Sequence, residues 1–218
     1  MIKGAIFDLD GTLLDSMWIW DNIGEAYLHS IGYEPKENLT EAFRTFSLYQ
    51  AACYYKSEYG VTLSVDEIMN GINSMVEKYY ENDVVLKSGA DEFLNRLQKI
   101  GVRMCIATAT DKYLVEAALK RCRVDGYFSD IFTCTSVGHG KDEPDIYRAA
   151  LNHLGTDKSD TVVFEDSLFA LKTAKADGFI TAAVADCHEK NQAELRSLAD
   201  CYITDYSDTE QFFNRSIK

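Results

Sequence analysis

The chain has 218 residues, of which 46% are hydrophobic, and its formal net charge is -13. This length and apolar content suffice for one large domain or for one domain with an insertion. The acidic balance excludes a protein that binds nucleic acid through a basic face, and no apolar run approaches the length of a transmembrane helix. A small phosphorylated ligand stays possible, because it needs only a local positive site.

The first predicted element is a buried strand that ends on two carboxylates. The apolar run of residues 4–7 is followed by Asp8 and Asp10, and then by Gly11 and Thr12. Such a run is typical of a parallel sheet, and ligands bind just beyond the carboxyl ends of its strands. Two carboxylates placed there repel each other, so we expect a divalent cation with a preference for oxygen ligands between them.

The next segment, residues 16–83, is predicted to be helical. Ser64 and Glu67 form a capping box, and apolar residues follow at helical spacing. Gly60 separates this helix from another that we expect over residues 41–59. We therefore expect a helical cap domain, inserted after the first strand and standing over the carboxyl edge of the sheet.

After this insertion, strand-like and helix-like segments alternate. The apolar runs predict strands over residues 102–107, 131–134, 162–164, 181–184 and 201–203. Capping residues and glycines predict helices over about residues 89–100, 111–122, 145–154, 167–177 and 190–198. The alternation predicts an α/β fold, a Rossmann-like doubly wound parallel sheet built from residues 1–15 and 84–218, with the α-helical cap inserted in it.

The six cysteines show no C-x-x-C pair, and no secretory signal precedes them. We expect reduced, mostly buried thiols in a cytoplasmic protein. A zinc site is the weaker alternative, because the paired spacing of its ligands is missing and the histidines show no such spacing either.

Four polar signals fall at the ends of successive predicted strands: Asp8-x-Asp10-Gly-Thr, Thr108, Lys141 and Glu165-Asp166. Each alone has a plainer interpretation, namely a turn, a helix cap, a solvated lysine or an N-cap pair, and Thr110 is a better cap candidate than Thr108. Together and in this order they resemble the motifs of the haloacid dehalogenase superfamily of hydrolases. The chain is similar to the helical-cap branch of β-phosphoglucomutase and phosphoglycolate-phosphatase-like enzymes.

Phosphoryl transfer needs a nucleophile, a proton donor for the leaving oxygen and positive charge on the phosphoryl oxygens. In this scheme Asp8 is the nucleophile that forms an aspartyl phosphate, and Asp10 is the general acid and then the base. Thr108 and Lys141 complete the catalytic set. Phosphate would be bound by Asp8, by Thr108 with the following backbone N–H of Ala109, and by Lys141.

The same resemblance implies a magnesium site. Its expected ligands are Asp8, the backbone carbonyl of Asp10, Asp166 and Glu165, the last either directly or through water. The implied protein is a Mg²⁺-dependent phosphatase that acts on a small phosphorylated metabolite through an aspartyl phosphate. The sequence gives no indication of the oligomeric state.

The sequence departs from the family pattern at three places. Lys141 is followed by two acids before Pro144, where Lys-Pro-x-Pro is frequent, and Ser88 replaces a proline that commonly precedes Gly89. Trp20 stands where the family's sugar phosphomutases have a histidine. We therefore favour a phosphatase over a β-phosphoglucomutase-type enzyme. A catalytically idle binding or regulatory protein of the same fold is the third possibility, and Trp18 and Trp20 are either cap packing or a lid over the site.

Overall fold

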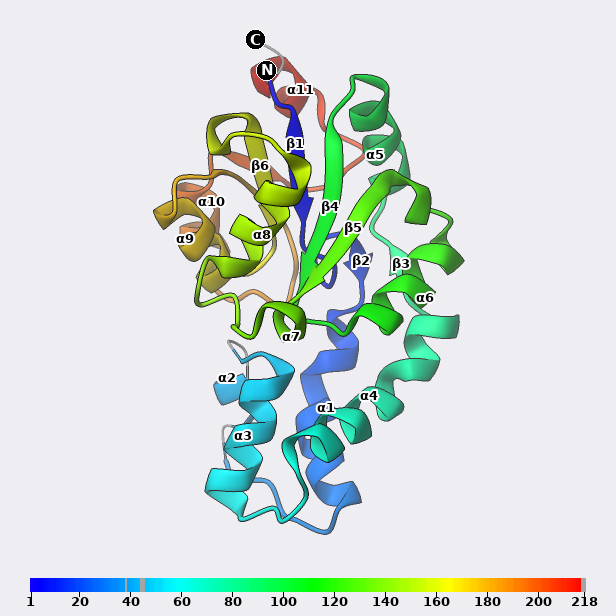
Figure 1. The fold of residues 1–218 in the computed structure, drawn as a ribbon, viewed down its shortest axis with the longest axis vertical. Coiled ribbons are helices and arrows are strands. Elements are labelled where there is room, and N and C mark those ends of the chain that lie inside the picture. The colour runs from blue at the N-terminus through cyan, green and yellow to red at the C-terminus, as the bar shows by residue number, and fades with distance from the viewer. Residues whose placement is uncertain (38, 44–45, 217–218) are drawn as a thin grey trace.

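The computed structural model describes residues 1–37, 39–43 and 46–216, and its centre is a six-stranded parallel sheet (Figure 1). The strand order is β5-β4-β1-β6-β7-β8, so the chain starts in the middle of the sheet and crosses over to both sides. The strands are β1 (Gly4–Phe7), β4 (Arg103–Thr108), β5 (Phe128–Thr133), β6 (Thr161–Glu165), β7 (Ile180–Val184) and β8 (Cys201–Ile203). The predicted doubly wound α/β fold is confirmed.

Helices cover both faces of this sheet, and alternate residues of each strand pack on opposite faces. In β1, Phe7 belongs to the apolar cluster under α5 (Ala90–Lys99), α6 (Lys112–Cys122) and α11 (Glu210–Ser216). Its neighbour Ile6 belongs to the cluster on the other face. That face is covered by α8 (Asp145–Leu154), α9 (Leu168–Ala176) and α10 (Gln192–Leu198). Because both faces are buried, the central strands β1 and β6 are fully buried and largely apolar, as their sequences indicated, whereas the edge strand β5 carries Ser129 and Asp130.

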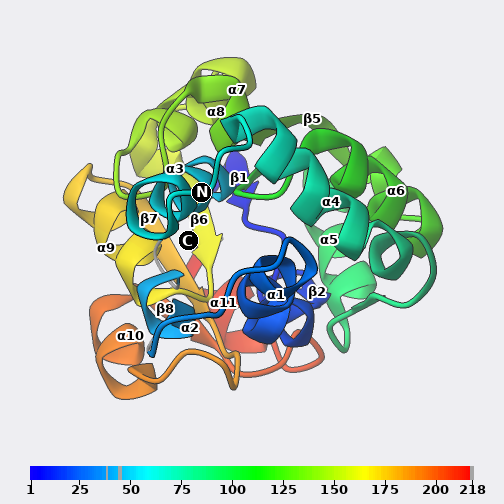
Figure 2. The same cartoon turned by 90° about the horizontal axis from the view of Figure 1, so that it is seen from below.

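Four helices of the described residues stand between two short strands that connect them to the sheet. The strands β2 (Leu14–Asp15) and β3 (Val85–Leu86) pair antiparallel, so the chain leaves and re-enters this region at one place. The helices are α1 (Met17–Ser30), α2 (Leu39–Phe43), α3 (Leu48–Tyr59) and α4 (Val65–Asn82). They lie beyond the carboxyl ends of the sheet strands, and Figure 2 looks at the molecule from their side. We refer to residues 16–83 as the helical insertion.

The prediction of one helix over residues 41–59 is wrong. Helix α2 ends at Phe43, and α3 begins at Leu48 behind the N-cap Ser47. The Ser47 hydroxyl accepts the N–H of Gln50 at 3.2 Å, and the Gln50 side chain accepts the N–H of Ser47 at 2.7 Å. This capping box satisfies backbone donors at a helix start, and it is the local reason for the break.

The strand predicted over residues 131–134 also differs from the structure. It begins earlier, at Phe128, and ends at Thr133, because Thr133 caps the short helix α7 (Cys134–Val137). The strands β2 and β3 and the helices α7 and α11 were not predicted. The 3₁₀ turns η1 (Asp125–Tyr127) and η2 (Lys158–Asp160) complete the list. Within the described ranges, no helix has both the length and the apolar character needed to span a bilayer.

Candidate active site

The predicted motif residues after β1 and β6 meet at the carboxyl edge of the sheet. Asp8, Glu165 and Asp166 each place a carboxylate oxygen within 4.8 Å of the others. The Nζ atom of Lys141 donates to Oδ1 of Asp8 at 2.5 Å and to Oε1 of Glu165 at 2.7 Å. Asp8 lies more than 130 positions before the other three residues. It meets Glu165 and Asp166 because β1 and β6 are adjacent parallel strands.

The loop after β1 is shaped to bring these acids together. Gly11 has a positive φ of 76°, a conformation that favours glycine, and it lies against the carboxylate of Asp166. The hydroxyl of Thr12 donates to Oδ1 of Asp166 at 3.0 Å. The glycine and threonine of the first motif therefore position Asp166 as well as form the turn.

The charges of this cluster are buried and do not balance. Burial alone would lower the pKa of Lys141, but Asp8 and Glu165 outweigh it and raise that pKa, so the lysine stays cationic. Burial raises the pKa of Glu165 to about 7, although Lys141 opposes the shift. Burial, with the charges of Asp8 and Glu165, also raises the pKa of Asp166. Three carboxylates facing one ammonium leave negative charge uncompensated when all are ionised.

These residues fit a magnesium ion. Among the described side chains, Oε2 of Glu165 is one of few buried polar atoms that have no hydrogen-bond partner. An orphaned buried oxygen of this kind is costly unless a ligand contacts it. The donors are all carboxylate oxygens, which Mg²⁺ prefers, and a divalent cation supplies the positive charge that the cluster lacks. Asp10 offers no side-chain ligand to this group of three.

The side chain of Asp10 is instead held by three hydroxyl groups. Its Oδ1 accepts from Ser16 at 2.6 Å and from Tyr80 at 2.5 Å, and its Oδ2 accepts from Thr110 at 2.6 Å. Burial raises the pKa of Asp10, and these three hydrogen bonds oppose the shift because they favour the carboxylate. Asp10 is thus fixed from three separate parts of the chain.

Thr108 lies buried at the end of β4, and Ala109 follows it. The Thr108 hydroxyl oxygen accepts the backbone N–H of Thr110 at 3.2 Å. The interpretation of Thr110 as the helix cap is wrong, since α6 is preceded by Asp111 as its N-cap and the Thr110 hydroxyl donates to Asp10. The phosphate-binding roles of Thr108 and Ala109 stay predictions.

Sequence reasoning missed four residues that donate hydrogen bonds to the acids. Ser16, Tyr80 and Thr110 donate to Asp10, and the hydroxyl of Tyr147, on α8, donates to Oε1 of Glu165 at 2.7 Å. Burial raises the pKa values of both tyrosines well above their usual range, so their hydroxyls stay protonated donors. Neither tyrosine belongs to a local motif. Thr110 carries a signal, its position two residues after Thr108, but that position also fits a helix cap.

The two tryptophans of α1 have different surroundings. Trp18 is 44% exposed and packs its ring edge-on against Tyr79, with centroids 5.3 Å apart. Trp20 is partly buried, and its indole N–H donates to the hydroxyl of Tyr80 at 3.0 Å. Trp20 is therefore linked through Tyr80 to Asp10, whereas Trp18 donates to the backbone carbonyl of Asp15.

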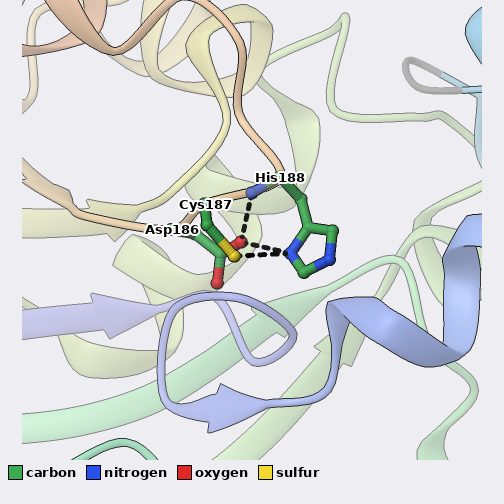
Figure 3. A group of neighbouring side chains, drawn as sticks. All are labelled: Asp186, Cys187 and His188. Atoms are coloured by element: carbon green, nitrogen blue, oxygen red, sulfur yellow. Dashed lines mark hydrogen bonds and ion pairs between the residues drawn. The ribbon is translucent and has the colours of Figure 1, made fainter.

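A second cluster of metal-ligating residue types follows β7 (Figure 3). Asp186 Oδ1 accepts the backbone N–H of His188 at 2.9 Å and lies 2.8 Å from its ring Nδ1, while Oδ2 pairs with Lys87 at 2.8 Å. The other ring nitrogen of His188 lies 3.1 Å from Asp21 on α1. These contacts tie the core to the helical insertion and engage the atoms that a metal would need. All six cysteines are free, but only Cys105 and Cys134 are buried, so the expectation of mostly buried thiols is wrong.

The fold and the carboxylates at the sheet edge define a doubly wound α/β protein with a helical insertion over a cluster of acids. The sequence profile of the haloacid dehalogenase-like hydrolases matches residues 5–184, and the chain belongs to that family. Its curated relatives include phosphatases, in agreement with the enzyme class that the sequence predicted. The resemblance inferred from the four motifs is confirmed.

Two relatives illustrate the similarity. The chain is 28% identical to the pyrophosphatase PpaX of Bacillus velezensis over 188 residues, which are 84% of this chain and 83% of that protein. It is 26% identical to validoxylamine A 7'-phosphate phosphatase of Streptomyces hygroscopicus subsp. limoneus, covering 95% and 96% of the two chains. The crystal structure of CbbY from Rhodobacter sphaeroides in complex with phosphate superposes with a TM-score of 0.84 at 23% identity, covering 96% of this chain and 97% of that one, which shows the shared fold.

Proposed function

We propose that this protein is a Mg²⁺-dependent phosphatase that hydrolyses a small phosphorylated metabolite through an aspartyl phosphate on Asp8. The observation that carries the proposal is the placement of Asp8. Its Oδ1 is held by Lys141, and its carboxylate stands beside Glu165 and Asp166, whose buried oxygens suit a divalent cation. The net charge of -13 fits a small ligand captured by a local positive group better than a polyanion.

In the first step a carboxylate oxygen of Asp8 attacks phosphorus. The Asp8 O–P bond forms, the P–O bond to the leaving group breaks, and Asp10 gives a proton to the departing oxygen. In the second step water attacks the same phosphorus while Asp10 takes its proton. The Asp8 O–P bond breaks, and inorganic phosphate and the free carboxylate result.

Two sets of protein groups would stabilise the negative charge on the phosphoryl oxygens. Lys141 contributes an ammonium fixed beside Asp8, and we assign to Thr108 and the N–H of Ala109 the remaining phosphate contacts. Asp8, the backbone carbonyl of Asp10, Glu165 and Asp166 would hold Mg²⁺. When bound, Mg²⁺ would neutralise charge on the phosphoryl group and on Asp8.

We also propose that residues 16–83 act as a cap domain that closes the site, and that residues 1–15 and 84–218 form the catalytic core. The tie between His188 of the core and Asp21 of the insertion supports a closed arrangement. The six free thiols support the expectation of a reducing, cytoplasmic compartment.

Phosphate release from a panel of small phosphate esters, with p-nitrophenyl phosphate included, tests the proposal. We expect turnover that depends on Mg²⁺ and is lost in Asp8→Asn. Intact-mass spectrometry after a rapid quench should show a phosphate adduct on the wild-type protein and a longer-lived one on Asp10→Asn. A phosphate adduct on Asp8→Asn, or no turnover of any ester by the folded protein with Mg²⁺, contradicts the proposed function.

A further inference from the structure

Trp20, Tyr80 and Asp10 form a directed chain of two hydrogen bonds. The indole N–H of Trp20 donates to the hydroxyl of Tyr80 at 3.0 Å, and that hydroxyl donates to Oδ1 of Asp10 at 2.5 Å. Trp20 lies on α1 and Tyr80 on α4, so both aromatic residues belong to the helical insertion. Asp10 belongs to the loop after β1. The chain of hydrogen bonds therefore crosses from the insertion to the core.

The direction of this chain follows from the chemistry of its members. An indole N–H only donates, and a carboxylate only accepts. A tyrosine hydroxyl has a single proton, and here its oxygen already accepts from Trp20. Its proton is therefore directed at Asp10, and Trp20 fixes that direction.

Packing leaves the Tyr80 hydroxyl little freedom. The side chain is fully buried and belongs to the same apolar cluster as Leu13 and Leu14, on the loop and strand after Asp10. The ring of Trp20 lies against it, with centroids 6.4 Å apart and an interplanar angle of 65°. The hydroxyl is thus presented to Asp10 by a rigid ring and not by a mobile side chain.

We propose that Tyr80 is a positioning residue for proton transfer: its hydroxyl, oriented by Trp20, holds the Asp10 carboxylate in its working orientation. Of the three hydroxyls that donate to Asp10, this one is carried by α4, far along the helical insertion. The orientation of Asp10 therefore depends on α1 and α4 being seated against the core. The inference rests on the proposed function, since it takes Asp10 to be the acid and base.

The variant Tyr80→Phe removes the hydroxyl and keeps the ring, and p-nitrophenyl phosphate separates its effects. Loss of the leaving group as p-nitrophenolate needs little protonation, so formation of the phosphoenzyme should continue, whereas its hydrolysis needs Asp10. We expect kcat to fall on the order of 10- to 100-fold, as for a lost hydrogen bond to a charged group. KM should fall in parallel, kcat/KM should stay near the wild-type value, and phosphoenzyme should accumulate in quenched samples.

Two further substitutions complete the test. Trp20→Phe frees the Tyr80 proton to point elsewhere, so it should give the same pattern with a smaller loss of kcat, on the order of a few-fold. On an alkyl phosphate, whose leaving group needs a proton, both variants should also lose kcat/KM. Tyr79→Phe and Trp18→Phe are matched controls, since these two rings pack against each other, and both should keep the wild-type constants.

The outcomes separate this inference from the proposed function. If Asp10→Asn turns over p-nitrophenyl phosphate like the wild type, the proposed function fails. If Asp10→Asn loses turnover while Tyr80→Phe keeps wild-type kcat and accumulates no phosphoenzyme, the proposed function stands and the role of Tyr80 is overturned. If Tyr80→Phe lowers kcat/KM on p-nitrophenyl phosphate as much as it lowers kcat, the substitution has damaged the site generally. That result also overturns the positioning role of Tyr80. If Tyr80→Phe does not fold, a wild-type kcat in Trp20→Phe overturns the positioning role of Tyr80.

Discussion

Gly11 and Asp166 lie so close together that a side chain at position 11 would overlap the Asp166 carboxylate. A β-carbon there would stand 2.7 Å from Cγ of Asp166 and 2.9 Å from Cγ of Met17. Gly11 also has a φ of 76°, which L-residues rarely adopt. The glycine of the first motif therefore has two separate reasons to be glycine: its own backbone conformation, and the carboxylate of Asp166, which directly follows β6 and lies against it.

Replacing this glycine should damage the metal site more than the fold. In Gly11→Ala the methyl group displaces Asp166, so we expect phosphatase activity and Mg²⁺-induced stabilisation to be lost. Gly178→Ala is the matched control, because Gly178 has a φ of 90° and no atom within 4 Å of its β-carbon position. That variant should lose about 1–2 kcal/mol of stability from backbone strain and keep both properties. Equal loss of activity in the two variants would contradict the role given to Gly11.

Magnesium should stabilise the folded protein. An ion that binds only the folded state adds RT ln(1 + [L]/Kd), about 2.7 kcal/mol at a hundredfold excess over Kd. For a chain of this size that corresponds to a rise in Tm of about 5–10 °C. Asp166→Asn should reduce the gain, whereas Asp125→Asn, on the exposed η1 turn, should not. A melting curve that does not respond to millimolar Mg²⁺ would argue against the site.

A phosphatase and a sugar phosphomutase can be distinguished by their products. A mutase keeps water from the aspartyl phosphate and returns the phosphoryl group to a second hydroxyl. The family's sugar phosphomutases have a histidine where this chain has Trp20. The indole of Trp20 donates to Tyr80 and cannot carry a proton. We therefore expect steady release of inorganic phosphate and no glucose 6-phosphate from β-glucose 1-phosphate, even with a bisphosphate primer. Isomerisation without phosphate release would favour the mutase.

Asp177 should make stability depend on pH. Hydrogen bonds from Arg148, with further help from Lys158, lower the pKa of Asp177. A group whose pKa is lower in the folded state stabilises above its unfolded pKa of about 3.9, and the contribution is lost as the pH falls through the folded value. Asp177→Asn should therefore lower Tm by about 2–4 °C at pH 7, a modest effect because Arg148 is half exposed.

The same variant should approach the wild type as the pH falls through the lowered pKa of Asp177, because the carboxyl group is then protonated in both the folded and the unfolded state. Thermal melts of the two proteins between pH 7 and pH 2 measure the difference. Asp125→Asn, with the same change of charge at an exposed site, should show no comparable convergence. A difference in Tm that does not change with pH would exclude the ion pairs of Asp177 as its cause.

The sequence by itself determined the parallel sheet, the alternation of strands and helices along the chain, and the chemistry at the carboxyl edge of the sheet. Short apolar runs that end in Asp8, Thr108 and Glu165 can be identified without a structure, because buried parallel strands are apolar throughout and ligands bind beyond their carboxyl ends. Such signals are local. The helix predicted over residues 41–59 was wrong although its break is also marked locally, by the capping box of Ser47 and Gln50.

Only the tertiary structure decided which groups hold the acids. The donors to Asp10 include Tyr80 and Thr110, 70 and 100 positions away, and Tyr147 reaches Glu165 from a different helix. No pattern in the sequence marks the two tyrosines, because their contacts depend on how the helices α4 and α8 pack against the sheet. The sequence identified the carboxylates, and the packing of the helices determines how each of them is oriented.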